Sequence, residues 1–378
     1  MDGASPPAHH PGHDSSISLS NPTTAEDSAP PPAAAVQSGG NDDDDEEDMV
    51  FDDNDSAFGG SLIGYDTETI ASYVTDYRYE NGRRYHAALS SSEYWGPNDE
   101  LANDQQNLAH HMYFITLEGK LHLAPIVNPQ DILDVGTGNG IWAVHIADEY
   151  PSAQVLGNDI SPIQPRFVPP NCKFEIDDLN STWMHCENHF DFIHIRELFG
   201  CIVDWDDFFT QAFKHTKPGG YVEIIEHSVS PEADDGTVND QGFFTRWGKT
   251  VVELGEMSGK SFTIYKESKS RMEHAGFVEV VEKSYKWPMN TWPSPNLQPD
   301  GNDGGMNWKK LRELGRWNQL RLYYGVEGFM LRLLTTVKGW PYEKAQDYLV
   351  EMQAALMDLS VHAYLVVTVV YGRKPGGA

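Results

Sequence analysis

Short apolar runs alternate with stretches of helical spacing between residues 131 and 230. Strands that alternate with helices in this way favour a parallel sheet with helices on both faces. The pattern therefore predicts an α/β domain that begins near residue 127. Five runs rich in β-branched and aromatic residues predict its strands: DILDVG from Asp131, AQVLGNDIS from Ala153, CKFEIDD from Cys172, FDFIHIR from Phe190 and GYVEIIEHSV from Gly220.

The rest of the domain, which we extend to residue 378, adds two strands and several helices. Helices are predicted from Gly242 and from Tyr265, followed by a strand near Val278. The run AYLVVTVVYGRKP predicts a last buried strand. Between these two strands lies a largely helical insertion at about residues 300–360, which we expect to cap the carboxyl edge of the sheet.

A polar and aromatic segment, residues 61–126, precedes the domain. Apolar positions at helical spacing, followed by a stop at Gly119, predict a helix near its end. We interpret this stretch as an N-terminal helical segment that leads into the domain. The apolar face of the helix is predicted to comprise Leu108, His111, Met112, Ile115 and Leu117.

The first 60 residues differ from the rest in composition. They hold fourteen of the 57 acidic residues and none of the 27 basic ones, and they are rich in Pro, Ser and Ala. Such a segment buries too little apolar surface to offset its ordering entropy, so we predict a disordered acidic tail over residues 1–60. A docking segment for a basic partner is the alternative interpretation.

Charge and cysteine usage exclude several classes of protein. The formal net charge of −30 repels phosphate backbones, so direct nucleic-acid binding is not expected. The longest apolar stretches fall short of a membrane helix. Three cysteines without paired spacing fit a reducing compartment, with the cytoplasm expected and the nucleus as the alternative. His185, Cys186 and His189 lack a second pair of ligands, so no metal site is expected.

A glycine-rich turn follows the first predicted strand of the domain. Gly136, Gly138 and Gly140 allow the backbone to bend sharply and to approach a ligand closely, which is typical of a nucleotide-cofactor site, although loop glycines can also be purely structural. A dinucleotide fingerprint would place its third glycine where Ile141 stands. This disfavours a nicotinamide dehydrogenase.

Acidic residues stand at the ends of the next two predicted strands. Asp159 ends the second strand, where a carboxylate can accept both hydroxyls of a ribose. Asp177 and Asp178 end the third strand and are in position to accept an adenine amino group. Any one of these acids alone would be read as a solvated loop residue or a helix cap. Three at successive strand ends favour an adenosine site.

These pieces resemble the class I methyltransferases that use S-adenosylmethionine. The resemblance is carried, in family order, by DILDVGTGNGIW, VLGNDIS, FEIDDLNSTW, FDFIHIRELFG and KHTKPGGYVEIIE. A narrower set, NGRRYHA, GPNDE, HHMYFITLEGKLHLAPI, DDGT, RWG and VVYGRKP, is similar to fungal LaeA-like methyltransferases from about Tyr77 to Pro375. The resemblance implies a Rossmann-like seven-stranded sheet that binds S-adenosyl-L-methionine at the glycine turn.

Two functions are compatible with this resemblance. The first is transfer of a methyl group to a small-molecule acceptor of secondary metabolism. The alternative is a LaeA-like regulator of secondary-metabolite gene expression that acts with a protein partner. Aromatic and Met residues of the helical insertion are expected to line part of an acceptor pocket, which suits a hydrophobic small molecule.

The resemblance also implies roles for individual residues. The glycines of the turn would line the methionine moiety, Asp159 the ribose, and Asp177 with the backbone at Asp178 the adenine. Asp134, just before the turn, would order the loop. Tyr85, with His86, would belong to a lid over the cofactor, although ordinary packing is an equal alternative for both.

Candidates for a catalytic base follow the fourth and fifth predicted strands. A sulfonium is already an excellent leaving group, so positioning supplies most of the rate and a base helps only a hydroxyl or acidic carbon acceptor. Arg196 and Glu197 end one strand, and Glu226 and His227 end the next. His227 is the preferred base, whereas His194 is expected to be a core histidine.

Overall fold

A computed structural model of the chain describes residues 77–86, 94–296 and 305–376. The predicted acidic tail, residues 1–60, lies outside the described residues. The predicted segment 61–126 is described only in part.

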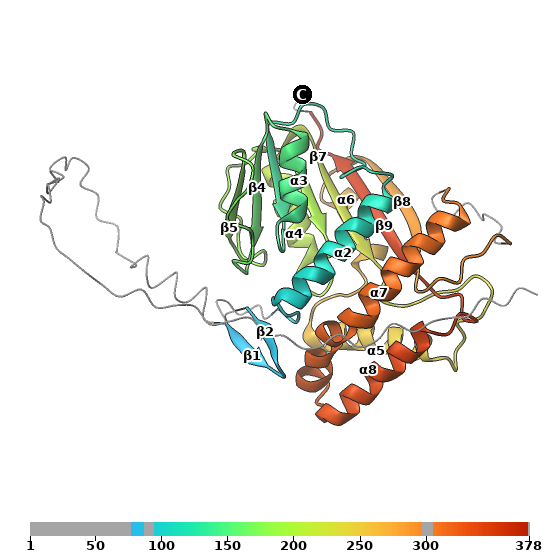
Figure 1. Ribbon diagram of the computed structural model, residues 1–378. Helices are drawn as coiled ribbons and strands as arrows, with labels where there is room; N and C mark the ends of the chain where they lie inside the picture. The colour runs from blue at the N-terminus through green and yellow to red at the C-terminus, as the bar shows by residue number, and fades with distance from the viewer. Residues whose placement is uncertain (1–76, 87–93, 297–304, 377–378) are drawn as a thin grey trace, which may run out of the picture. The chain divides into compact units, whose positions relative to one another are not determined.

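A mixed sheet of seven strands forms the centre of the domain, in the order β5-β4-β3-β6-β7-β9-β8 (Figure 1). The pairs among β3 to β7 are parallel, which confirms the five predicted strands and their direction. The two later strands are also present, and β9 runs antiparallel to both of its neighbours. The strands are β3 (Asp131–Val135), β4 (Gln154–Asp159), β5 (Cys172–Ile176), β6 (Phe190–Arg196), β7 (Thr216–His227), β8 (Val278–Pro288) and β9 (Tyr364–Arg373).

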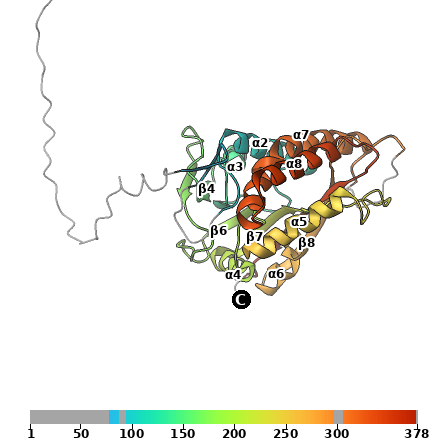
Figure 2. The ribbon, with the colours of Figure 1, turned by 90° about the horizontal axis from the view of Figure 1, so that it is seen from below.

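Helices cover both faces of this sheet, as predicted (Figure 2). One face carries α2 (Glu100–Thr116), α3 (Ile141–Glu149) and α7 (Trp308–Arg332), and the other carries α4 (Trp205–His215) and α6 (Ser268–His274). Because both faces are covered, the central strands are apolar on both sides. Phe192 and Ile193 of β6, adjacent residues that point to opposite faces, are both fully buried.

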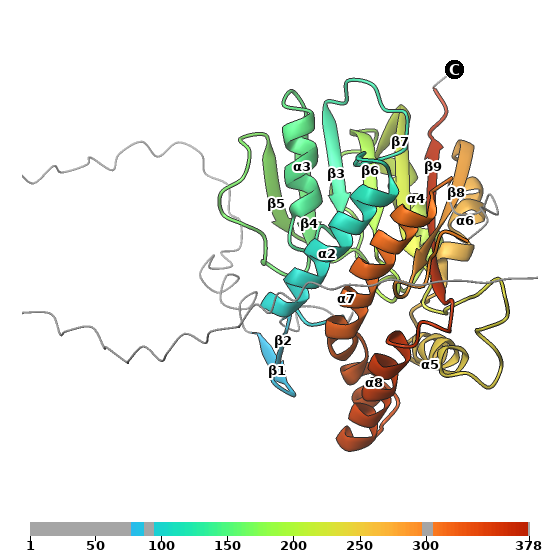
Figure 3. The ribbon, with the colours of Figure 1, turned by 45° about the vertical axis from the view of Figure 1, so that its right-hand side comes forward.

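The helical insertion consists of α7, a π-helical turn η2 (Leu333–Val337) and α8 (Tyr342–Leu356). Asn307 caps α7 by accepting hydrogen bonds from two backbone N–H groups. The helix packs along α2 and β8. The α8 helix packs against α5 (Phe243–Ser258) beyond the carboxyl ends of the parallel strands (Figure 3), whereas α7 lies along a face of the sheet. A single 3-10 turn, η1 (Ile264–Lys266), follows α5.

The segment before the domain contains a hairpin as well as the predicted helix. Strands β1 (Arg78–Glu80) and β2 (Arg83–Tyr85) pair antiparallel. Asp99 accepts a hydrogen bond from the N–H of Ala102 as the cap of α2, and it also receives two hydrogen bonds from the Arg83 guanidinium, at 2.6 and 2.8 Å. One carboxylate thus starts the helix and ties the hairpin to it.

The apolar face of α2 differs from its prediction. His111, predicted on that face, is exposed, whereas His110 and Tyr113, which the prediction did not include, are buried. The His110 ring contacts His145 of α3, with 2.9 Å between Nε2 and Nδ1. A neighbouring helix, invisible in local periodicity, has therefore set which histidine faces inward.

Candidate functional site

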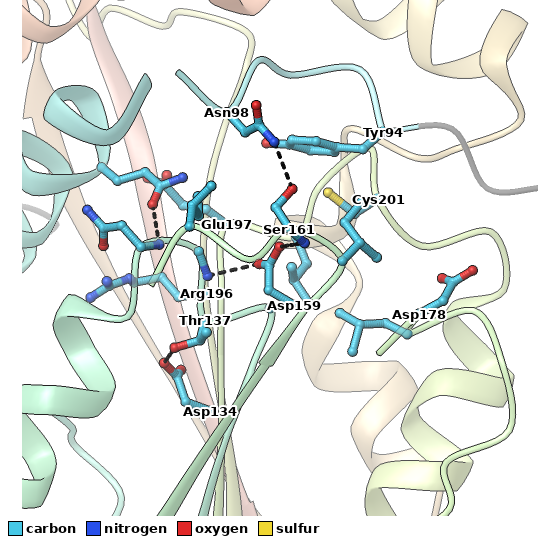
Figure 4. A pocket seen from close by; sticks show the side chains of 18 of the residues that line it. Tyr94, Asn98, Asp134, Thr137, Asp159, Ser161, Asp178, Arg196, Glu197 and Cys201 are labelled. Atoms are coloured by element: carbon cyan, nitrogen blue, oxygen red, sulfur yellow. Dashed lines mark hydrogen bonds between the residues drawn. The ribbon is translucent and has the colours of Figure 1, made fainter. Parts of the chain in front are cut away.

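A cavity opens where β3, β4 and β6 end, and we call it the glycine-turn cavity (Figure 4). Tyr94 and Asn98 lie on one side of it, and Asn98 donates a hydrogen bond to the Ser161 hydroxyl at 3.2 Å. Several residues named from the sequence line it together: Asp134, Gly136, Gly138, Asp159, Asp178, Arg196 and Glu197.

The glycines of the turn all have positive φ angles, of 68° at Gly136, 59° at Gly138 and 80° at Gly140. A Cβ at Gly136 would lie 2.5 Å from Leu198 Cδ2. Gly140 does not line the cavity, unlike its predicted role: it caps α3, where a Cβ would lie 2.5 Å from the Phe174 ring. Two glycines therefore face the cavity and the third permits helix packing.

Three backbone N–H groups of this turn donate hydrogen bonds to other groups of the protein. The N–H of Gly138 donates to Asp159 Oδ2 at 2.9 Å, and the N–H of Asn139 donates to Gln106 Oε1 at 2.7 Å. The N–H of Thr137 donates to the Asn158 carbonyl at 2.8 Å. A phosphate cradle needs such N–H groups free to face the anion. In this structure these three N–H groups are therefore not free to face a phosphate.

Asp134 lies beneath the turn and orders it. The Thr137 hydroxyl donates to one carboxylate oxygen at 2.6 Å, and His194 Nδ1 lies 2.8 Å from the other. The His194 ring stacks on Trp142 at 3.6 Å, and burial lowers its pKa to about 4. His194 is thus a core histidine that fixes the orientation of Asp134.

Asp159 is one of four acidic residues that line the cavity. Its Oδ1 accepts a hydrogen bond from the N–H of Ser161 at 2.9 Å, and its Oδ2 accepts the Gly138 bond. Burial raises the pKa of Asp159 to about 6, despite these hydrogen bonds. Each oxygen keeps a second lone pair, so the carboxylate can still accept hydroxyl groups from a ligand.

The end of β5 contributes one of its two acids. Asp178 lines the cavity together with Leu179 and Asn180. Asp177 is not among the lining residues: its backbone N–H donates to the Asp159 carbonyl, which continues the β4–β5 pairing. The predicted adenine contact of Asp177 is therefore not brought to the site, whereas Asp178, predicted beside it, lines the cavity.

A second cavity, which we call the aromatic cavity, adjoins the first. The two share the lining residues Tyr94, Pro97, Gln106 and Glu197. Six Trp, Tyr and Phe side chains line the aromatic cavity, and the ring centroids of two of them, Trp95 and Phe329, lie 5.1 Å apart. Its lining also includes Trp247, Phe199, Met289, Leu322, Val326, Met352, His227 and Arg321.

The four candidates at the ends of β6 and β7 have different surroundings. Arg196 faces the glycine-turn cavity, His227 faces the aromatic cavity and Glu197 lines both. Glu226 lines neither: it accepts hydrogen bonds from the N–H groups of Leu198 at 2.8 Å and Phe199 at 3.3 Å. Burial raises the pKa of Glu226 well above its usual value. The structure thus places Glu226 under a loop, away from the predicted catalytic position.

Glu197 is the centre of a charged cluster between the cavities. It has a φ of 55°, uncommon for a residue other than glycine. Its carboxylate accepts a hydrogen bond from the Tyr113 hydroxyl at 2.9 Å and two from Arg321 Nη2 at 2.8 Å each. Burial alone would raise the pKa of Glu197, but Arg321, His227 and Arg196 outweigh it and lower that pKa.

The lid assigned to Tyr85 is not at the site. Tyr85 is buried outside both cavities, with the Arg332 guanidinium 4.7 Å from its ring centre. Tyr94 lines the glycine-turn cavity instead. Burial raises the pKa of its hydroxyl well above the usual value. Tyr94, Gln106 and Arg321 were missed because no motif marks them, and Arg321 comes from an insertion far along the chain.

Two other expectations concern metals and membranes. Over the described residues, no group of three or more His, Cys, Asp or Glu side chains is arranged to hold a metal ion. In the same part of the chain, every helix is too short or too polar to cross a bilayer.

Known proteins resemble this chain over most of its length. It is 33% identical over 310 residues to Methyltransferase pytC of Aspergillus terreus (strain NIH 2624 / FGSC A1156), which covers 81% of this chain and 91% of that protein. Secondary metabolism regulator LAE1 of Cochliobolus heterostrophus is 32% identical over 304 residues, covering 78% and 94%. Protein-methionine methyltransferase laeA of Emericella nidulans is 28% identical over 302 residues, covering 78% and 76%.

The sequence profile of a methyltransferase domain matches residues 108–319, from α2 into α7. That match spans more than half of the chain and includes the glycine turn, Asp159 and Glu197, whereas Arg321 lies just beyond it. The protein therefore belongs to the methyltransferase domain family.

Proposed function

We propose that this protein transfers a methyl group from S-adenosylmethionine to a small-molecule acceptor. The observation that carries the proposal is the shared wall between the two cavities, formed by Tyr94, Pro97, Gln106 and Glu197. A methyl donor in one cavity and an acceptor in the other would meet at that wall. Methyl transfer needs this proximity more than it needs a nucleophilic side chain.

The glycine-turn cavity fits the cofactor. A Cβ at Gly138 would lie 2.6 Å from Gln106 Oε1, so the bare backbone keeps the space open. The Asp159 carboxylate would accept the ribose hydroxyls, and the end of β5 at Asp178 would meet the adenine. Arg196 also lines this cavity, and its guanidinium would pair with the methionine carboxylate.

The cofactor, when bound, supplies a methyl group on a positively charged sulfur. The chain's own residues orient the partners and exclude water. Holding acceptor and methyl in line at about 3 to 3.5 Å can contribute roughly 7–11 kcal/mol to lowering the barrier. The aromatic cavity suits an apolar acceptor, because its walls are mainly aromatic, Leu, Val and Met side chains.

Replacement of the ribose-binding acid tests this assignment. A hydrogen bond to a charged group contributes about 1.5–3 kcal/mol. Asp159→Asn removes the charge from the group that would accept the ribose hydroxyls. We expect calorimetry to show binding of S-adenosylmethionine weakened roughly 10- to 100-fold. Asp148→Asn, an exposed change on α3, is the matched control. Equal affinities for the two variants would reject the site.

The raised pKa of Asp159 predicts a pH dependence for the same binding. The ionised carboxylate accepts both ribose hydroxyls, whereas the neutral acid carries a proton on one oxygen. Because the pKa of Asp159 is about 6, affinity should fall as the pH is lowered through 6. We expect binding about tenfold weaker at pH 5 than at pH 7. In Asp159→Asn this dependence should disappear.

A regulator of secondary metabolism is the second candidate, favoured by the identity to LAE1 and laeA over 78% of the chain. In this role the chain would act in a protein complex, and we propose a nuclear location for it, against a cytoplasmic one for the enzyme. Comparison of metabolites from strains with and without the gene separates the two. A single compound shifted by one methyl supports the enzyme, and loss of many compounds supports the regulator.

A further inference from the structure

The His227 imidazole presents a lone pair to the aromatic cavity. Its Nδ1 lies 2.9 Å from the Ser228 carbonyl oxygen, which can only accept, so Nδ1 carries the hydrogen and Nε2 the lone pair. Burial lowers the pKa of His227, so the ring is neutral near pH 7. The Nε2 atom lies 3.4 Å from Arg321 Nη1, a long contact that a ligand can replace.

The charged groups around this imidazole come from two elements. Glu197, at the end of β6, has its Oε1 3.5 Å from His227 Nε2, and Arg321 of α7 binds that carboxylate. From β8 the imidazole meets the uncharged Trp287 ring at 5.9 Å. Glu197 is a weak base, because its oxygens already accept bonds from Arg321 and Tyr113. His227 is therefore the stronger proton acceptor beside the cavity.

Two residues that line the aromatic cavity each carry a buried polar atom whose hydrogen-bonding capacity is unused. Within the part of the chain that the structure describes, Trp95 Nε1 and Gln105 Oε1 have no hydrogen-bond partner. Both residues line the cavity. Leaving such groups unpaired is costly, so a ligand that fills the cavity should bring polar atoms of its own.

Resting on the function proposed above, we propose that the acceptor is a phenol-type molecule: an aromatic ring, held by the side chains around Trp95 and Phe329, that bears an ionisable hydroxyl next to His227 and Arg321. The hydroxyl proton passes to His227 Nε2. A lone pair on the oxygen forms the new bond to the methyl carbon, and the electron pair of the broken carbon–sulfur bond stays on sulfur. Glu197 offsets the positive charge gained by His227, and Arg321 faces the developing oxyanion.

A thioether or an amine acceptor would gain less than a phenol from His227 and Arg321. A thioether has no proton to give, and its methylation creates a new positive charge beside Arg321. A neutral amine likewise becomes a cation as it is methylated. A phenol is the acceptor for which a neutral imidazole and a guanidinium both help.

The ionisation of a bound probe tests this inference without turnover. We would titrate the protein with 4-nitrophenol, whose phenolate absorbs visible light, and use methyl 4-nitrophenyl sulfide as a thioether of the same frame. We expect the phenol to bind with its pKa lowered by about one unit or more, and to bind at least tenfold more tightly than the thioether. A bound probe that stays neutral, equal affinity for the thioether, or no binding of the phenol would each overturn the inference.

Three variants test which residues lower the pKa of bound 4-nitrophenol. In His227→Gln the pKa of bound 4-nitrophenol should return toward its value in water. Arg321→Lys keeps a cation beside Glu197 and should retain part of the shift. His111→Gln, an exposed change outside both cavities, should behave as the unchanged protein. If the pKa of bound 4-nitrophenol were lowered as much in His227→Gln as in the unchanged protein, His227 would not be the proton acceptor.

A parallel measurement keeps the two proposals distinguishable. Calorimetry with S-adenosylmethionine on the same preparations tests the cofactor site alone. If the cofactor binds and the bound phenol stays neutral, the phenol inference fails and the methyltransferase proposal stands. If the cofactor does not bind, the proposed function itself fails.

Discussion

At the scale of the residue, two glycines distinguish two reasons for having no side chain: a positive φ angle, and a lack of space for a Cβ. Gly136 and Gly236 share a positive φ, of 68° and 76°. A Cβ at Gly136 would meet Leu198, which lines the glycine-turn cavity, whereas nothing lies within 4 Å of a Cβ at Gly236. The two positions therefore form a matched pair.

We predict that Gly136→Ala and Gly236→Ala each lower the free energy of unfolding by about 1–2 kcal/mol, the cost of an L-residue in the left-handed region. Gly136→Ala should in addition weaken S-adenosylmethionine binding, because the new methyl group pushes Leu198 into the cavity. Denaturant titration and calorimetry measure the two effects. Loss of binding in Gly236→Ala, or full binding in Gly136→Ala, would contradict the steric explanation.

Strand ends indicated the right edge of the sheet, but not always the right side chain. Consecutive residues of a strand point to opposite faces, so of Glu226 and His227 one had to turn away from the aromatic cavity. The sequence alone does not say which face α7 will cover, and hence which of the two is useful. Asp177 and Asp178 follow β5 in a loop, where strand alternation no longer applies, and only Asp178 of the two lines the glycine-turn cavity.

At the scale of the element, α7 completes the site from far along the chain. Its Arg321 reaches Glu197 at the end of β6, a separation of 124 residues, and both side chains are largely buried. Removing one partner of such a pair leaves an uncompensated charge, which costs more than the pair contributes. The helix and the Glu197 cluster should therefore be coupled in stability.

We expect Arg321→Met to lower the free energy of unfolding by about 3 kcal/mol, because the Glu197 charge loses its counterion. Adding Glu197→Gln to that variant should recover about 1 kcal/mol or more, since no buried charge is then left unpaired. Chemical denaturation of the single and double variants closes the cycle. Strictly additive losses would show that the pair is not coupled.

The elements themselves were largely predictable, because their signals are local. Apolar runs located all seven strands of the central sheet. The β1–β2 hairpin was missed, because its strands are three residues each and carry mainly charged side chains. Its place depends on the pairing of Arg83 with Asp99, a tertiary contact that local spacing does not reveal.

At the scale of the whole molecule, the site depends on parts that meet only after folding. The glycine turn and Asp159 lie in the predicted sheet, but the shared wall comes from Tyr94, Pro97 and Gln106 before the domain. The aromatic cavity adds residues of α5, α7 and α8. Sequence motifs therefore indicated the cofactor side of the reaction, whereas the acceptor side required the assembled fold.

The central claim is that donor and acceptor occupy adjoining cavities and meet at their shared wall. A crystal structure of the protein with S-adenosylhomocysteine tests it most directly. We predict the ribose at Asp159 and the sulfur at the wall formed by Tyr94, Gln106 and Glu197, open toward the aromatic cavity. A sulfur that faces away from that cavity, or a ligand bound outside the glycine-turn cavity, would contradict the account.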